Sequence, residues 1–156
     1  MLYCARALDV AQDAEDAAQE VFLRAWRKAA TYEPAKGAVS TWLYRIAVNH
    51  CSDRNRRSAF RRFLGLEAAG ERQDDTPGAA RTLIFRAALA AARAEIARLP
   101  TRQRQVLLLQ VIGAMDTSTI AATLGTGTGA VEQLLVRARA TLRQRLGADF
   151  IVEKGD

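Results

Sequence analysis

Residues 116–146 read DTSTIAATLGTGTGAVEQLLVRARATLRQRL, and this stretch decides the fold of the C-terminal half of the chain. One face of a short helix carries Ile120, Ala121 and Leu124. Gly125 follows as the expected end of that helix, and Thr128 is the expected N-cap of a second one. The apolar positions of the second helix recur every three or four residues, at Ala130, Val131, Leu134, Leu135, Ala138 and Leu142. The pattern predicts a helix-turn-helix.

Three positions meet the mechanical needs of that motif. Ala121 is small enough for two helices to cross closely, Gly125 makes the turn, and Val131 joins the second helix to the first. Arginines then accumulate at the end of the second helix, at Arg137, Arg139, Arg143 and Arg145. This is expected if the helix lies near phosphates, and the alternative is an ordinary helical hairpin with a solvated basic face.

The composition is that of a soluble globular protein with a polyanionic partner. The chain has 156 residues, 49% hydrophobic and 26% charged, which suits one ordinary domain or two small ones. The net charge of +6 favours nucleic acid, with an anionic membrane surface as the alternative. No stretch of about eighteen apolar residues occurs and residues 1–10 do not resemble a signal peptide, so we expect a cytoplasmic protein without membrane insertion.

Cysteine and histidine are too few for a metal or a disulfide framework. The chain has two cysteines, Cys4 and Cys51, which do not form a CxxC pair, and a single histidine, His50. We therefore expect no metal site and no cofactor. Each cysteine is predicted to be a small buried hydrophobe rather than a redox group, and His50 to be structural. Strand signals are nearly absent while Ala, Leu, Arg, Gln and Glu dominate, so the predicted fold class is all-α.

An amphipathic helix is predicted after Asp13, its expected cap. Its apolar stripe comprises Ala14, Ala17, Ala18, Val21, Phe22, Ala25 and Trp26. The opposite face carries first acids and then bases, namely Glu15, Asp16, Gln19, Glu20, Arg24, Arg27 and Lys28. This order could reflect the helix dipole alone, or the acidic turns could dock on a basic partner helix.

A loop and a second helix complete the first half. Pro34 and Gly37 interrupt residues 31–37, and Ser40 or Thr41 is the expected cap of the next helix. Its predicted buried stripe is Trp42, Leu43, Ile46, Ala47, His50 and Cys51, with Arg45, Asn49, Ser52, Asp53 and Arg56 outward. A basic end follows, with Arg54, Arg56, Arg57, Arg61 and Arg62.

A site for single-stranded nucleic acid requires aromatic rings on which bases stack and cations that bind phosphates. The short loop and the second helix offer aromatic, amide and guanidinium groups of this kind. The alternative is that Trp42 belongs to the core and the arginines form a solvated tail.

Glycines, Pro77 and polar residues make residues 59–82 a predicted flexible linker, with a short helical piece near 60–66. We therefore expect two small helical domains, at residues 1–58 and 83–156, the second a winged-helix-like helix-turn-helix domain. The wide apolar run in TRQRQVLLLQVI, residues 101–112, predicts its central helix, with Arg102 and Arg104 exposed at the start.

Three motifs in this order resemble one family. The chain resembles an extracytoplasmic-function (group IV) sigma factor of the sigma-70 family in three motifs. These are DAEDAAQEVFLRAW, then STWLYRIAVNHCSDRNRR, and then LPTRQRQVLLL followed by TIAATLG and GAVEQLLVRARATLR. The similarity spans roughly residues 3–146. It implies a non-enzymatic subunit that directs bacterial RNA polymerase to promoters and initiates transcription, in many members under control of an anti-sigma factor.

The resemblance also implies site residues. The clamp of the polymerase β′ subunit would contact Asp16, Gln19, Glu20 and Leu23, and the β flap would meet the second domain. The −10 element would be opened and held by Tyr32, Lys36, Trp42, Arg45, Asn49, Arg56 and Arg57. The −35 duplex would be bound by Arg102, Arg104, Thr128, Glu132, Gln133, Arg137 and Arg139.

The chain departs from the family pattern in three places. The family usually has a further helix of about twenty residues before Tyr3, and without it part of the stripe with Val21, Phe22 and Trp26 should be exposed. Glu132 and Gln133 stand where the family often has cations, which should weaken phosphate anchoring while leaving base contacts open. The loop at 125–129 lacks the proline often found there, so we expect it to be looser.

Two other functions remain as alternatives. A stand-alone helix-turn-helix repressor or activator would bind a duplex operator as a dimer, and a gel shift without polymerase would reveal it. An enzyme would need Asp13, Glu15, Asp16 and Glu20 as a carboxylate metal site, without any histidine, and metal-dependent thermal stabilisation would support it.

Overall fold

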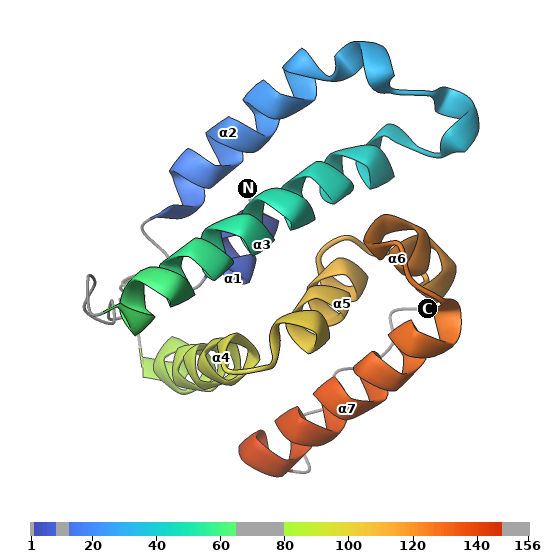
Figure 1. Cartoon of the computed structure of the whole chain (residues 1–156). Helices are drawn as coiled ribbons and strands as arrows, with labels where there is room; N and C mark the ends of the chain where they lie inside the picture. Colours follow the sequence, from blue (N-terminus) through green and yellow to red (C-terminus); the bar gives the residue numbers. More distant parts are fainter. Residues whose placement is uncertain (1, 9–12, 65–79, 148–156) are drawn as a thin grey trace.

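The computed structural model of the chain describes residues 2–8, 13–64 and 80–147, and within these ranges it consists of helices, turns and loops without a strand. Its helices are α1 Leu2–Ala7, α2 Ala14–Arg27, η2 Ala29–Thr31, η3 Pro34–Lys36, α3 Val39–Phe63, α4 Ala80–Ala97, α5 Thr101–Val111, α6 Thr117–Leu124 and α7 Thr128–Leu146. The all-α prediction is confirmed for the described residues (Figure 1).

Helices α2 and α3 run antiparallel and form the body of the N-terminal half (Figure 1). The contact face of α2 is made of small side chains, because Ala17, Ala18 and Val21 are all buried. Small residues let two helix backbones approach closely, and α3 meets them with Ala47 and Val48. Helix α1 packs against both α2 and α3.

The expectation that part of the apolar stripe of α2 is exposed is confirmed at two positions. Phe22 is 55% exposed and Trp26 is 83% exposed, whereas Val21 is buried. The contacts of α2 are made through α1 and α3 on the side of its buried alanines, so the outer edge of the wide stripe remains in solvent. Asp13 does occupy the N-cap position, but its carboxylate pairs with Arg54 at 2.7 Å instead of capping the helix.

Helix α3 begins earlier and ends later than the sequence predicted. Its N-cap is Ala38, so Ser40 and Thr41 lie inside the helix and the expectation that either is the cap is wrong. At its other end the helix continues to Phe63, and residues 59–63 of the expected linker are therefore helical. The rest of that linker, 65–79, falls outside the described residues.

The expected helix-turn-helix forms from α6 and α7. Asp116 caps α6 by accepting a hydrogen bond from the Thr119 amide at 2.7 Å. Gly125 ends α6 with a left-handed φ of 63°, a conformation that favours glycine. The N-cap of α7 is Gly127 rather than Thr128, which is the first helical residue. Val131 and Ala121 are buried between the two helices, as the pattern predicted.

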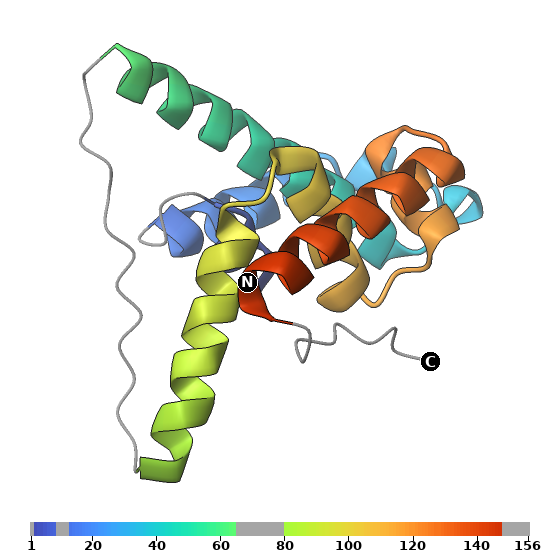
Figure 2. The ribbon, with the colours of Figure 1, turned by 90° about the horizontal axis from the view of Figure 1, so that it is seen from below.

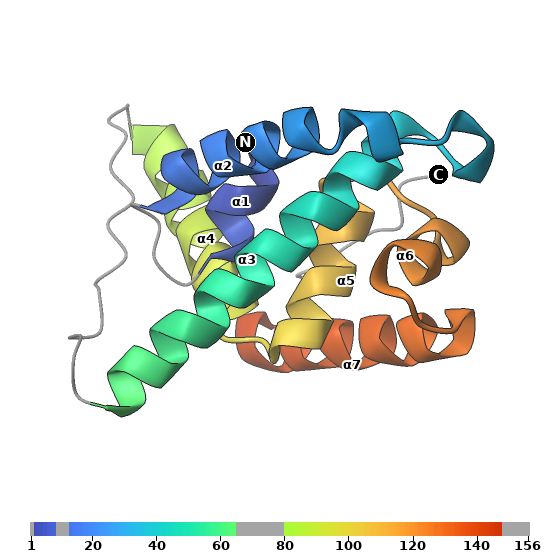
Figure 3. The ribbon, with the colours of Figure 1, turned by 45° about the horizontal axis from the view of Figure 1, so that its top comes forward.

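Helix α5 is the central helix of the C-terminal half. Val106, Leu107, Leu108 and Leu109 are all buried, which confirms the prediction from the apolar run. The helix contacts α1, α6 and α7 (Figure 3). Arg104 at its start is only 3% exposed and donates to the Ala97 carbonyl at 2.9 Å, so the prediction that it is exposed is wrong.

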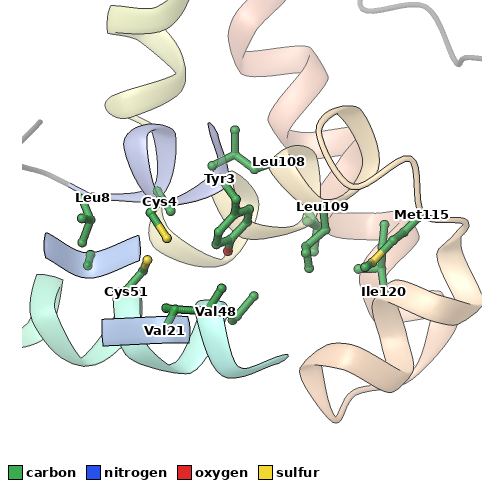
Figure 4. Close-up of a cluster of buried hydrophobic side chains, with 14 of the residues drawn as sticks. Tyr3, Cys4, Leu8, Val21, Val48, Cys51, Leu108, Leu109, Met115 and Ile120 are labelled. Carbon is green, nitrogen blue, oxygen red and sulfur yellow. The ribbon is translucent and has the colours of Figure 1, made fainter. Parts of the chain in front are cut away.

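The two halves share one hydrophobic core. Figure 4 shows Tyr3 and Val48 of the first half in the same cluster as Leu108, Leu109 and Ile120 of the second. Helix α3 also contacts α6, and α1 contacts α4 and α5 (Figure 2). The N-terminal and C-terminal modules are therefore packed directly against each other.

Polar contacts cross the same boundary. The Gln105 amide donates to the Ser52 hydroxyl at 2.6 Å, and the Tyr44 hydroxyl donates to the Ile112 carbonyl at 3.4 Å. Arg45 donates to the Ala122 carbonyl of α6 at 2.8 Å. Directional contacts of this kind fix the orientation of one module on the other.

Candidate nucleic-acid interfaces

The loop between α2 and α3 is held in shape by its own residues. The Tyr32 hydroxyl donates to the Gly37 carbonyl at 3.2 Å, and Lys36 pairs with Glu33 at 2.7 Å. Gly37 adopts a φ of 135°, which L side chains rarely adopt. The rings of Tyr32 and Trp42 lie 5.7 Å apart with an angle of 53° between their planes. The loop thus places an aromatic pair at the start of α3.

A pocket of about 340 Å³ opens beside this aromatic pair. Its lining includes the cations Arg24, Lys28, Lys36 and Arg45, the rings of Tyr32 and Trp42, and the amide of Asn49. The only acidic residue of the lining is Glu33, which is paired with Lys36. A concave site with aromatic faces, an amide and several cations matches the chemistry of an unpaired, negatively charged strand.

The structure brings together five of the seven residues predicted for the −10 element. Tyr32, Lys36, Trp42, Arg45 and Asn49 line the pocket. The other two do not line it: Arg56 and Arg57 lie about two helical turns beyond Asn49 along α3. Both are exposed, and Arg56 pairs with Asp53 at 2.9 Å.

Sequence reasoning missed two cations of this pocket. Arg24 and Lys28 at the end of α2 were placed on the face opposite the apolar stripe, where the order of acids and bases could reflect the helix dipole alone, yet both line the pocket. Their spacing of four residues places them on one side of the helix, directly before the loop, and this was the available signal. Arg24 also pairs with Glu20 at 2.9 Å, which lowers the pKa of that carboxyl group.

Helix α7 presents a polar face to solvent. Thr128, Glu132, Gln133 and Arg137 are all exposed and recur at helical spacing. Val136 lies among them and is 65% exposed, although the sequence pattern did not single it out. An apolar group beside amides and carboxylates can contact a thymine methyl in a major groove. The signal for it was a valine outside the buried spacing of Val131, Leu135, Ala138 and Leu142.

The other three predicted −35 residues occupy different environments. Arg102 is exposed at the start of α5. Arg104 is buried, as described above, and Arg139 is half-buried and donates to the Gln110 side chain at 2.7 Å. Arg104 and Arg139 therefore hold protein groups in this arrangement, whereas Arg102 faces solvent.

A third surface lies on α2. Asp16, Gln19, Glu20 and Leu23 recur at helical spacing, with Asp16 and Gln19 exposed and Leu23 49% exposed. Phe22 and Trp26 are exposed beside them. Large apolar side chains next to acids on one helix form a surface suited to a protein partner.

The described residues contain neither a cluster of metal ligands nor a membrane-spanning helix. Across residues 2–8, 13–64 and 80–147, no three or more His, Cys, Asp or Glu side chains come together in a way that could hold a metal ion. In the same part of the chain, none of the helices has the length and apolar character needed to cross a bilayer.

The fold and these surfaces define a class of protein: a helical, two-module DNA-binding protein with a helix-turn-helix at its C-terminal end. Family comparison narrows the class. Residues 3–61 match sigma-70 region 2, and residues 89–142 match sigma-70 region 4.

Two relatives have similar sequences. The RNA polymerase sigma factor CnrH of Cupriavidus metallidurans is 34% identical, over 88% of this chain and 75% of CnrH. The ECF RNA polymerase sigma factor SigM of Mycobacterium tuberculosis is 38% identical over 87% of this chain, which spans 65% of the length of SigM. The chain belongs to the extracytoplasmic-function sigma factors of the sigma-70 family, which are not a class of enzyme.

Two solved structures have the same fold. The sigma factor RpoE from Bartonella quintana, in complex with the anti-sigma factor NepR, matches 95% of this chain and 89% of RpoE with a TM-score of 0.74 at 20% identity. CnrH, in complex with the cytosolic domain of CnrY, matches 94% of this chain and 79% of CnrH with a TM-score of 0.62 at 28% identity.

Proposed function

We propose that this chain directs RNA polymerase to promoters by holding an unpaired −10 strand in its first module and a −35 duplex on its second. The observation that carries the proposal is the pocket beside Tyr32 and Trp42, which combines aromatic faces with several cations. The catalysis of RNA synthesis belongs to the polymerase.

The pocket suits a base that has left the double helix. A planar base can stack on the exposed flank of the aromatic pair, while Asn49 offers an amide for hydrogen bonds to the base edge. Arg24, Lys28 and Lys36 line the pocket and would supply positive charge for the phosphates. Arg56 and Arg57 would follow the backbone further along α3.

The exposed face of α7 suits an intact major groove. Gln133 can read adenine, Glu132 can accept from cytosine, and Val136 can meet a thymine methyl. Arg137 and Arg102 are the exposed cations for the flanking phosphates.

The α2 surface with Asp16, Gln19, Glu20 and Leu23 is the proposed contact with the polymerase clamp. Its partner would have to present cations to the two acids and an apolar groove to Leu23 and Trp26. Membership of the sigma factor family makes core polymerase and promoter DNA the partners of the chain, and we infer that it acts in the cytoplasm, where these are found.

An anti-sigma factor is a further proposed partner. RpoE has been solved in complex with the anti-sigma factor NepR and CnrH in complex with the cytosolic domain of CnrY, and this chain shares their fold. We call the pocket beside Tyr32 and Trp42 the strand-binding pocket. Its Arg45 already donates a hydrogen bond to the Ala122 carbonyl of α6. A regulator that stabilised this packing would keep Arg45 from a phosphate.

The test is to replace Trp42 with alanine and measure binding by the holoenzyme. Loss of one stacking platform is expected to weaken binding of a single-stranded −10 oligonucleotide by roughly 5- to 150-fold, equivalent to about 1–3 kcal/mol. Binding of a −35 duplex should not change, because Trp42 lies in the other module. Equal affinity of both proteins for the single strand would contradict the proposal.

A further inference from the structure

The two cysteines of the chain meet in the core of the first half. Cys4 belongs to α1 and Cys51 to α3, and each is only 2% exposed. Figure 4 shows their sulfur atoms pointing toward each other across the gap between the two helices. Both are free thiols. The promoter-binding and polymerase-binding surfaces described above use neither of them.

The two thiols are chemically unequal. The Cys51 thiol donates a hydrogen bond to the Cys4 sulfur, and this lowers the pKa of Cys4 to about 7 although burial opposes the shift. The same hydrogen bond and burial raise the pKa of Cys51. Cys4 is thus the better nucleophile at neutral pH, and Cys51 is held beside it as a second thiol.

We propose that Cys4 and Cys51 form a peroxide-sensitive dithiol whose oxidation joins α1 to α3 by a disulfide. In the first step the Cys4 thiolate attacks one oxygen of hydrogen peroxide, the O–O bond breaks, and the second oxygen leaves as hydroxide, which takes up a proton to become water. Cys4 is then a sulfenic acid.

In the second step the Cys51 sulfur attacks the Cys4 sulfur and the S–O bond breaks. The oxygen, which already carries the hydrogen of the sulfenic acid, leaves as water after taking the proton of the Cys51 thiol. The proton released when Cys4 ionised balances the one that the hydroxide took up in the first step. Two thiols and one peroxide have then given one disulfide and two waters. A dithiol reductant reverses the change by exchange.

Access to the buried pair depends on α1. This helix has six residues, too few to be stable without the packing that holds it against α2, α3 and α5. Transient opening of α1 admits peroxide, so oxidation should be slow in the native protein and faster in mild denaturant. Once formed, the disulfide ties α1 to the helix that carries the strand-binding pocket, and α1 itself touches the second module.

The experiment uses the full reduced chain, treated with hydrogen peroxide under native conditions, denatured and alkylated. The expected product is a monomer that has lost both thiols together, is lighter by two hydrogen atoms, and regains both thiols with dithiothreitol. Its melting temperature should rise by about 10 °C, because the bond closes a long loop of the unfolded chain.

Cys4→Ser and Cys51→Ser are the matched controls, and neither should show the rise in melting temperature. If a serine variant does not fold, the oxidised and reduced wild-type proteins still decide the matter. Two outcomes overturn the proposal. One is that both thiols remain free while an unstructured cysteine peptide in the same solution is oxidised. The other is that disulfides form only between chains.

Discussion

The arginines of the second module differ in what they can contact. Arg137 is exposed on the face of α7 that carries Gln133. Arg104 is buried against the Ala97 carbonyl, and Arg139 donates to Gln110. A guanidinium engaged with protein groups contributes little to phosphate binding, so the salt dependence of duplex binding should report mainly on the exposed Arg102 and Arg137.

Replacing Arg137 with alanine is expected to weaken holoenzyme binding to the −35 duplex. It should also lower the slope of log affinity against log salt concentration by about 0.9, the value for one lost phosphate contact. Arg98→Ala is the matched control, because Arg98 is an exposed arginine of the α4–α5 connection paired with Glu95. An unchanged slope in Arg137→Ala would place this residue away from the DNA backbone.

His50 links the stability of the first module to pH. Burial, and then the charges of Arg24 and Arg54, lower the pKa of His50 below its usual 6.5. The unfolded chain therefore binds the proton more tightly than the folded chain does. The stability that His50 contributes is complete above about pH 6.5 and is lost as pH falls through the lower pKa of the folded state.

In His50→Gln, the free energy of unfolding should consequently vary less with pH between about pH 7 and pH 5 than in the wild type. Urea unfolding at several pH values measures this directly. Identical pH dependence in the two proteins would mean that His50 has the same proton affinity in both states.

At the scale of single elements, α2 combines two roles on opposite faces. Its inner face is made of buried alanines and Val21, which hold it to α1 and α3. Its outer face leaves Phe22 and Trp26 in solvent beside the acids. A helix that exposes large apolar groups while its small residues form the core is arranged for a second partner.

Replacing Asp16 and Glu20 with lysine should abolish co-purification with core polymerase while the circular dichroism spectrum stays the same. Among the described residues, the ion pair that this change breaks is the one between Glu20 and Arg24, and an ion pair at the surface contributes little to stability. Asp53→Lys with Glu132→Lys makes the same change in charge elsewhere and should retain binding. Retained binding by the α2 variant would rule out this assignment.

The sequence predicted helices better than it predicted their ends. The buried helix α5 and the turn at Gly125 could be predicted from the sequence. Buried positions favour apolar residues, and a left-handed backbone favours glycine. The cap at Ala38 was not readable, because alanine is a poor N-cap. At the start of α7 the neighbours Gly127 and Thr128 are both acceptable caps, so the sequence did not distinguish between them. The pocket was predicted in part, since Arg24 and Lys28 lie directly before the loop but were grouped with the polar face of the preceding helix.

At the scale of the whole molecule, the packing of one module on the other had no sequence signal. The contact between Arg45 and the Ala122 carbonyl joins an outward residue of one half to a backbone group of the other. Every residue has a backbone carbonyl, so the residue type does not show which carbonyl accepts a hydrogen bond. Contacts of this class are therefore seen only in the folded chain. Leu109 illustrates the result, since it is fully buried in the cluster that both halves share.

Leu109→Ala should therefore lower the free energy of unfolding by about 2–5 kcal/mol. Because the cluster spans both halves, thermal unfolding should shift as one transition rather than two. Leu89→Ala is the matched control: Leu89 is 40% exposed, and its loss should change stability by about 0.5 kcal/mol or less. Two separate transitions, with only one affected, would contradict the shared core.

The central claim is that this chain is an adaptor between core RNA polymerase and promoter DNA. The most direct measurement mixes the purified chain with core polymerase and a promoter pool, and follows both complex formation and transcript synthesis. We predict a stoichiometric complex and transcripts from a defined subset of promoters that core polymerase alone does not start. Absence of the complex, together with tight sequence-specific duplex binding by the chain alone, would contradict the account.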